Sequence, residues 1–165
     1  MKFIAPIWGL IGVVALLGFA IYRLAPRAWE ALQEGLTPFQ WCLMVVWTVF
    51  MVYSEGYRGF QKKFSPRTAA RVNYLSKSPS ATQTLLAPLF CMGYFGATRR
   101  VQITSICLTL GIVLLVLLVS QLPQPWRGIV DFGVVAGLSW GLLTFVAFYI
   151  QAATSENFAH DPCIE

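Results

Sequence analysis

The chain has 165 residues, of which 57% are apolar and 12% are charged, and its formal net charge is +5. Soluble domains average about 45–50% apolar and about 25% charged residues, so this composition excludes an ordinary soluble domain. The basic residues stand beside long apolar runs, so we expect anionic lipid as the counter-charge and no nucleic-acid partner.

The first apolar run covers residues 3–22 and carries no charge. About 20 residues cross the hydrocarbon core, whereas the core of a cleaved signal has about 7–15, so we expect a retained span. In the connection that follows, residues 23–38, Pro26 stands near the start and Gly35 at the end of a short helical pattern. Because proline suits a first helical turn and glycine a C-terminal end, we expect a short interfacial helix there.

The second predicted span covers residues 39–57, and a basic connection, residues 58–100, follows it. Ser65 stands before a proline, a combination typical of a helix start, and predicts a short helix over 65–75. A second Ser-Pro pair at Ser78 predicts another short helix. We expect these helices, too, to lie at the membrane interface.

The apolar segment 85–97 is ambiguous, because it has only thirteen residues and Pro88 interrupts it. Runs of about 10–14 residues are more often interfacial, re-entrant or buried than spanning. A crossing would also place Arg99 and Arg100 in a translocated turn, which the positive-inside rule disfavours. We expect this segment to lie on the membrane or to dock among the spans.

Two further spans are predicted at residues 101–122 and 129–150, joined by a tight turn. Together with the first two they make one membrane domain over residues 1–150. The tail, residues 151–165, is polar and carries only acidic charge, and we expect it to be mobile. The predicted fold is an all-α integral membrane protein with four transmembrane helices.

The basic residues predict how these spans are oriented. No acidic residue occurs between Glu55 and Asp131, and eight of the twelve Lys and Arg residues lie within 58–100. Loops rich in Lys and Arg stay cytoplasmic, so we expect this connection and both termini inside. The expected outer side then holds three basic residues: Arg23, Arg27 and Arg127. A bacterial inner membrane is the expected location, because the chain is compact and has no organelle-type transit segment.

A group of basic residues in the connection is interleaved with aromatic side chains and forms a predicted headgroup-binding surface. Its members are Arg58, Lys62, Lys63, Arg67 and Arg71. Each basic residue near an anionic surface contributes about 1 kcal/mol of attraction. The same residues are also explained by their role in setting the topology, and the two interpretations are compatible.

Two acidic residues are candidates for ionisable groups within the membrane, which are functional hypotheses by default. Glu55 stands at the exit of the second span, and Arg58 three residues later predicts an ion pair with it. Asp131 stands near the start of the fourth span, where Arg127 and the helix dipole favour a carboxylate. We expect the two acids near opposite interfaces, which is too far apart for a catalytic carboxylate pair.

The fourth predicted span carries a G-x-x-x-G-x-x-x-G motif formed by Gly133, Gly137 and Gly141. Spacing of four places the three glycines on one helical face, where another backbone can approach closely. The motif predicts helix packing. We favour a contact inside the chain, and a contact with a second copy or a partner stays open.

Few residues in the chain could carry chemistry. There is one histidine, the four cysteines form no C-x-x-C pair, and the common nucleotide-binding, zinc and hydrolase motifs are absent from the sequence. We expect no metal and no cofactor, and these counts argue against an enzyme.

Three functional hypotheses follow. The first is a non-enzymatic accessory, assembly or scaffold subunit that binds other membrane proteins, or a second copy of itself, and anionic lipid. The second is a small oligomeric transporter or channel that uses Glu55 or Asp131. The third is an enzyme that modifies lipid at the cytoplasmic interface.

Overall fold

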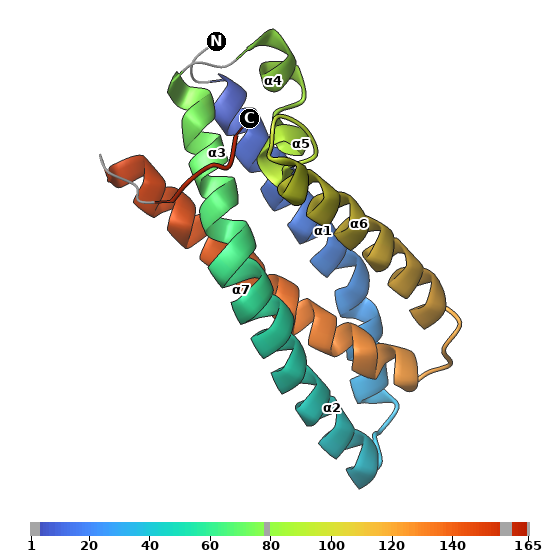
Figure 1. Ribbon diagram of the computed structural model, residues 1–165. Coiled ribbons are helices and arrows are strands. Elements are labelled where there is room, and N and C mark those ends of the chain that lie inside the picture. The colour runs from blue at the N-terminus through green and yellow to red at the C-terminus, as the bar shows by residue number, and fades with distance from the viewer. Residues whose placement is uncertain (1–3, 78–79, 156–159, 165) are drawn as a thin grey trace.

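The computed structural model describes residues 4–77, 80–155 and 160–164, and within them all regular structure is helical. Long helical rods run between the two ends of the molecule (Figure 1). They are α1 (Ile4–Gln33), the continuous run of α2 (Pro38–Met51), η1 (Val52–Phe64) and α3 (Ser65–Lys77), α6 (Arg99–Val119), and α7 (Trp126–Thr154). Two short helices, α4 (Ala81–Leu85) and α5 (Ala87–Met92), cap one end.

Three of the described helices, α1, α6 and α7, are long and apolar enough to cross a membrane, with mean hydropathies of 2.3, 2.5 and 1.8 over their most apolar stretches. These helices fit the predicted class, an all-helical protein embedded in a membrane. The remaining predicted span, residues 39–57, lies across the boundary of α2 and η1. The backbone hydrogen bonding changes at that boundary, so that α2 alone has 14 residues.

The interfacial helix predicted within residues 23–38 is not a separate element. α1 continues through Pro26 and ends at Gln33. Proline in a helix removes one backbone hydrogen bond, a loss that packing must offset. Ala28 and Ala31 supply such packing: both are buried, and Ala31 lies against Gly128 at the start of α7. Tertiary contacts thus keep this part of the chain in α1.

The continuous run of α2, η1 and α3, which we call the second rod, is also longer than predicted. It begins at a capping box in which Thr37 and Gln40 satisfy each other's backbone N–H groups, and it continues to Lys77 with helical dihedral angles where its parts meet. Ser65 therefore does not cap a new helix. Its hydroxyl lies 3.2 Å from that of Thr144 on α7. The next helix, α4, has Ser80 as its N-cap, and the start predicted at Ser78 lies outside the described residues.

The ambiguous segment 85–97 is docked against the long helices. Its helix α5 packs on α1, where Cys91 lies against Gly9 and Pro88 against Gly12. Neither glycine leaves room for a Cβ atom, so the two helices approach each other closely. α5 ends at Gly93, whose φ of 87° is the left-handed conformation typical of a C-cap.

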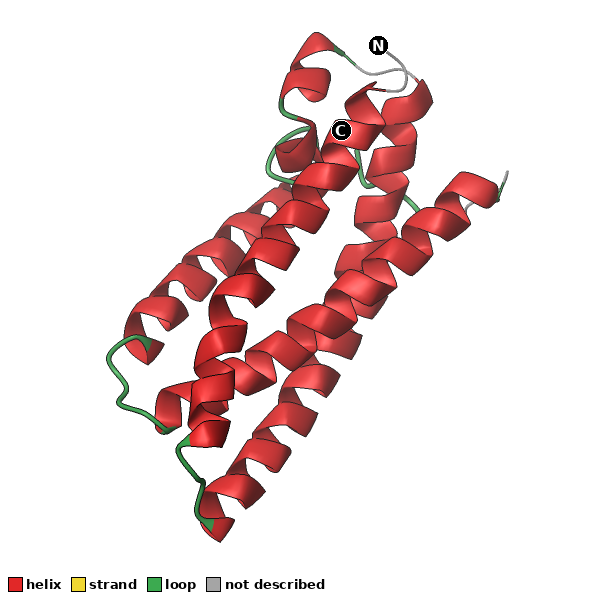
Figure 2. Cartoon of the chain, turned by 180° about the vertical axis from the view of Figure 1, so that it is seen from behind, coloured by secondary structure: helices red, strands yellow, loops and turns green. Residues whose placement is uncertain are grey.

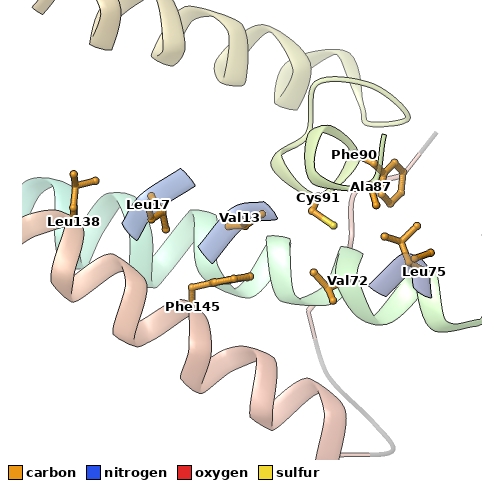
Figure 3. Packing of buried hydrophobic residues seen from close by; sticks show 10 residues of the cluster. Val13, Leu17, Val72, Leu75, Ala87, Phe90, Cys91, Leu138 and Phe145 are labelled. Atoms are coloured by element: carbon orange, nitrogen blue, oxygen red, sulfur yellow. The ribbon is translucent and has the colours of Figure 1, made fainter. Parts of the chain in front are cut away.

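The core joins four helices. Buried apolar side chains of α1, α3, α5 and α7 form one cluster (Figure 3), which includes Val13, Leu17, Val72, Leu75, Phe90, Cys91, Leu138 and Phe145. The connections 34–37 and 120–125 lie together at the end opposite the labelled termini (Figure 2). We call the end that carries α4 and α5 the capped end.

α6 stands apart from this core. Every residue from 110 to 118 is exposed, so that part of the helix packs against nothing on any of its faces. Side-chain hydrogen bonds attach the first half of α6 to residues at and after the end of α5. The Ser105 hydroxyl donates to the Met92 carbonyl at 2.9 Å, and the hydroxyls of Tyr94 and Thr109 are hydrogen-bonded.

Candidate functional site

The contact between η1 and α7 has an unusual helix on one side. η1 is a π-helix of 13 residues. π-helices bond residue i to residue i+5, occur mostly as single turns, and are frequent at functional sites. Because a π-helix is wider than an α-helix, residues four to five apart share a face of η1.

The width of η1 determines which side chains of the second rod contact α7. Gly56 and Phe60 lie against α7, followed by Ser65 at the start of α3. On an α-helix the residues three and seven positions after Glu55, Arg58 and Lys62, would share its face. Both are exposed instead. The π-helix thus keeps basic side chains away from the contact with α7.

The three glycines of α7 predicted to pack are covered by this rod. A Cβ atom added at Gly133 would lie 2.5 Å from Cδ1 of Trp47, and one added at Gly141 would lie 2.5 Å from Cγ of Phe60. A Cβ atom at Gly137 would lie 3.3 Å from the Met51 carbonyl oxygen. The glycine face therefore meets the chain's own helix and has no open side for a partner at these positions.

Glu55 lies in the middle of this contact. Its Oε2 atom would be 3.5 Å from a Cβ atom at Gly137, and it is buried without a hydrogen-bond partner. The ion pair predicted between Glu55 and Arg58 is not among the contacts of the described residues, and Arg58 is exposed. The π-helix explains this difference, because it turns the two side chains to different faces.

Asp131 has the partner that its sequence context predicts. Its Oδ2 lies 3.9 Å from Nε of Arg127, at the predicted spacing of four, and the residue is 4% exposed. This distance is too long for a hydrogen bond, and both atoms are buried without a hydrogen-bond partner. The two candidate acids do not form one site: Asp131 lies before Gly133 on α7, whereas Glu55 lies against Gly137.

A shallow, open pocket with three polar side chains among its lining residues lies beside the η1–α7 contact, toward the capped end. This pocket, of ≈ 240 Å³, is lined by Gln61, Thr144, Ala147, Phe148 and Gln151. Beside it, Nε1 of Trp140 donates to Oε1 of Gln61 at 2.9 Å. We call this pocket the inner groove.

A second pocket, of ≈ 250 Å³, lies between α2, the start of α7 and the connection that precedes α7. Its lining is apolar throughout and consists of Leu43, Trp47, Leu122, Trp126, Ile129 and Val130. This pocket therefore differs from the inner groove, whose lining includes polar side chains.

The predicted headgroup surface divides into two parts. Arg58, Lys62 and Lys63 are exposed, and Nζ of Lys62 lies 4.8 Å from the centre of the Tyr57 ring. Arg67 is half-buried, and burial lowers the pKa of its guanidinium. The exposed members are free to reach a membrane surface, because their stems can lie on apolar surface while their charges stay in water.

Arg71 is the exception, because it is fully buried. Its Nε donates to the Pro162 carbonyl at 2.8 Å, and its Nη1 donates to the Phe90 carbonyl at 2.5 Å. Its Nη2 donates to the carbonyls of Gly96 at 2.9 Å and Cys163 at 3.1 Å. Burial first, and then the charge of Arg67, lower the pKa of Arg71 to about 10, so it stays charged at neutral pH. Arg71 is a structural cation and does not belong to the headgroup surface.

Sequence reasoning missed this cluster of carbonyls around Arg71, which we call the Arg71 cluster. One signal was present: Arg71 is followed by Val72 and shares a helical face with Thr68 and Leu75, which are all buried. The tail predicted to be mobile contributes Pro162 and Cys163 to the cluster. The amide of Thr98 also donates to the Cys163 carbonyl, at 3.1 Å.

Among the described residues, no group of three or more His, Cys, Asp or Glu side chains is placed to hold a metal ion. Comparisons of the chain with protein-family models, with curated proteins and with solved structures found no match.

Proposed function

We propose that the chain is a non-enzymatic accessory or scaffold subunit of the bacterial inner membrane, which crosses the membrane four times and offers α6 to a partner membrane protein. Its capped end lies on the cytoplasmic side, where the exposed basic residues meet anionic headgroups. The proposal rests on the isolation of α6, on the contacts of the capped end and on the distribution of charge.

Contacts at the capped end support four crossings. Gly9 of α1 lies against Cys91, and Nε1 of Trp8 donates to the Leu85 carbonyl at 3.3 Å. The start of α1 and the start of α6 are therefore on the same side. Since α1 leads away from that side, the chain must return before α6 begins, and the rod of α2, η1 and α3 is the segment that returns. α6 and α7 supply the other two crossings.

The charges at the two ends support the orientation. The capped end carries exposed basic side chains from three elements, among them Lys63, Lys77 and Arg100. Positive charge is retained on the cytoplasmic side, and cytoplasmic leaflets are rich in anionic lipid, which attracts such residues. Reporter fusions after Lys77 and after Gln124 test this: the first should report the cytoplasm and the second the periplasm.

The observation that carries the proposed role is the exposure of α6. A helix that crosses a membrane gains little from burying apolar side chains, and it associates through close packing with another helix. Within this chain α6 finds no such helix beyond its first half. The glycine face, for which a contact with a partner had stayed open, is occupied by the chain's own helices. α6 is therefore the span left for a partner.

Photo-crosslinking in native membranes tests the role of α6. A photoreactive amino acid at Leu114 of α6 should give one discrete protein adduct, which mass spectrometry can identify. The same group at Val46, which is equally exposed on α2, serves as the matched control and should give lipid adducts alone. Lipid adducts alone at both positions would contradict the scaffold role.

A further inference from the structure

We propose that Glu55 is a proton-binding site within the membrane, that its proton exchanges with the capped side through the inner groove, and that protonation controls how tightly η1 packs on α7. This site does not depend on a partner at α6, so it goes beyond the proposed scaffold role.

The burial of one carboxylate oxygen is the first support. Oε2 of Glu55 is buried against Gly137 and has no hydrogen-bond partner. Burying an isolated charge is costly, and a carboxyl group in such a place takes up a proton instead. Ionisable side chains within membrane segments are rare and mark proton or ion pathways. A glycine opposite the carboxyl group gives it room to lie there.

No charged side chain of η1 or α2 neutralises Glu55. On η1, Arg58 is exposed and Lys62 lies over the Tyr57 ring. Tyr53 and Tyr57 stack on each other with their ring centres 6.0 Å apart. On α2, which also packs on η1, Cys42 is the titratable residue, and it is exposed.

The charged side chains of the other helices that pack against η1 either contact other groups or lie away from Glu55. On α7, Asp131 is paired with Arg127, at the other end of the glycine face, and Tyr149 lies beyond Thr144. On α3, Arg71 donates to four carbonyls. Arg67 stands on the turn before Arg71 and belongs to the capped end. Among the described residues no cationic side chain is paired with Glu55, and we infer that a proton neutralises it.

The surroundings of Glu55 provide access from one side only. Toward the capped end, Gln61, Thr144 and Gln151 line the inner groove, whose ≈ 240 Å³ can hold water. The Ser65 hydroxyl, hydrogen-bonded to that of Thr144, adds one further polar group beside it. Toward the other end, the contact consists of Met51, Trp47 and an apolar pocket. Glu55 itself does not line this groove, and Phe60 lies against Gly141 between the two, so we infer that exchange of the proton needs a movement of η1 that opens the way to these polar groups.

Protonation should also change the contact between the helices. The neutral carboxyl group can stay against Gly137, whereas the ionised group gains by turning toward water in the inner groove. Such a turn removes Glu55 from the face that meets α7. Because η1 is a π-helix, its backbone is already in a sparsely used form, which suits a helix with two arrangements.

Labelling with dicyclohexylcarbodiimide tests the proposal on the full chain in lipid vesicles. This apolar reagent reacts with protonated carboxyl groups in apolar places. Mass spectrometry should find the adduct on Glu55 and less of it on Asp131, which is also buried but has the charge of Arg127 at 3.9 Å and serves as the internal comparison. Above the midpoint of the titration the adduct should decrease about tenfold for each pH unit. No adduct at Glu55 at any pH, or an adduct that does not change with pH, would overturn the proposal.

A second arm separates a proton from a metal cation. At one fixed pH, NaCl should protect Glu55 from the reagent no better than choline chloride at the same concentration. Selective protection by sodium would show a sodium site in place of a proton site and would overturn the proposal.

The proposed link between protonation of Glu55 and the packing of η1 on α7 is tested by a separate measurement. Thermal stability of the wild type in vesicles should fall as the pH is raised through the labelling midpoint, because the ionised carboxyl group is not stabilised against Gly137. Glu55→Gln mimics the protonated form and should show no such fall, while Arg58→Gln, a neutralised neighbour, should retain it. Equal pH dependence in Glu55→Gln and in the wild type would contradict the link between protonation and packing.

Discussion

α6 and α7 are both apolar enough to cross a membrane, yet they are used in different ways. α6 is the more apolar, with a mean hydropathy of 2.5 against 1.8, but 6% of its most apolar stretch is buried in the chain against 33% for α7. Within a membrane, lipid already surrounds apolar side chains, so greater hydropathy gives a helix no reason to be buried. The comparison shows that hydropathy identifies a span and does not tell what the span packs against.

Small residues explain the difference between the two helices. α7 presents Gly133, Gly137 and Gly141 in line with Trp47, Met51 and Phe60 of the neighbouring rod. α6 has one glycine, Gly111, and a Cβ atom added there would meet open space. The remainder of its second half consists of Leu, Val and Ile. One helix therefore has a surface that fits another helix, and the other has a surface that fits lipid or a partner.

The largest effect is expected for the large side chain that α7 contributes to the core. Phe145→Ala should lower the free energy of unfolding by about 3 kcal/mol, because Phe145 is fully buried and its loss leaves a cavity. Leu114→Ala on α6 is the matched change, at a residue that is 59% exposed, and should cost less than about 0.5 kcal/mol. Chemical unfolding of the purified chain measures both. Equal losses would mean that α6 is packed as α7 is.

Overfilling the glycine face should have the next largest effect. Gly137→Leu should lower stability by about 1–3 kcal/mol, because the new side chain must displace Met51 or Glu55. Gly111→Leu makes the same change on α6 and should be neutral or slightly stabilising, since leucine is the better helix former. Thermal melting in detergent distinguishes them. Wild-type behaviour of Gly137→Leu together with a loss in Leu143→Ala, on the exposed face of α7, would place the glycine face toward lipid.

The smallest effect concerns the attachment of α6 to the capped end. Ser105→Ala removes the hydrogen bond to the Met92 carbonyl and should cost about 1 kcal/mol. Amide hydrogen exchange should increase in the loop between α5 and α6, with little change in α7. Thr104→Ala is the control, because that hydroxyl donates to Arg100 within its own helix. Equal exchange in the two variants would show that Ser105 does not hold α6.

The sequence predicted the structure best where a single physical rule determines the local arrangement. Long apolar runs predicted α1, α6 and α7, since a membrane needs about 20 apolar residues. The spacing of Arg127 and Asp131 predicted their ion pair, since residues four apart meet on any α-helix. The glycine spacing predicted a close contact, but it could not name the helix on the other side.

The sequence was least informative where tertiary packing overrides a local signal. Pro26 and the Ser65–Pro66 pair indicated helix starts, but α1 and the second rod continue through them because other helices pack there. The pairing of Glu55 with Arg58 assumed an α-helix, and η1 has another period. Arg71 was predicted at the membrane surface because it belongs to a basic group interleaved with aromatic residues. Its acceptors are backbone carbonyls, which every sequence contains, so the sequence could not identify them.

The Arg71 cluster imposes an order on biosynthesis. The ribosome makes Arg71 before α6 and α7, whereas the carbonyls of Pro162 and Cys163 follow both. Until α7 and the residues that follow it have been made and have packed against α3, the guanidinium lacks two of its four acceptors. A buried cation without its acceptors is unstable, so the capped end can close only in the last stage of assembly. Arg71 is therefore synthesised early, but its set of hydrogen bonds is completed only after the C-terminal residues have been made.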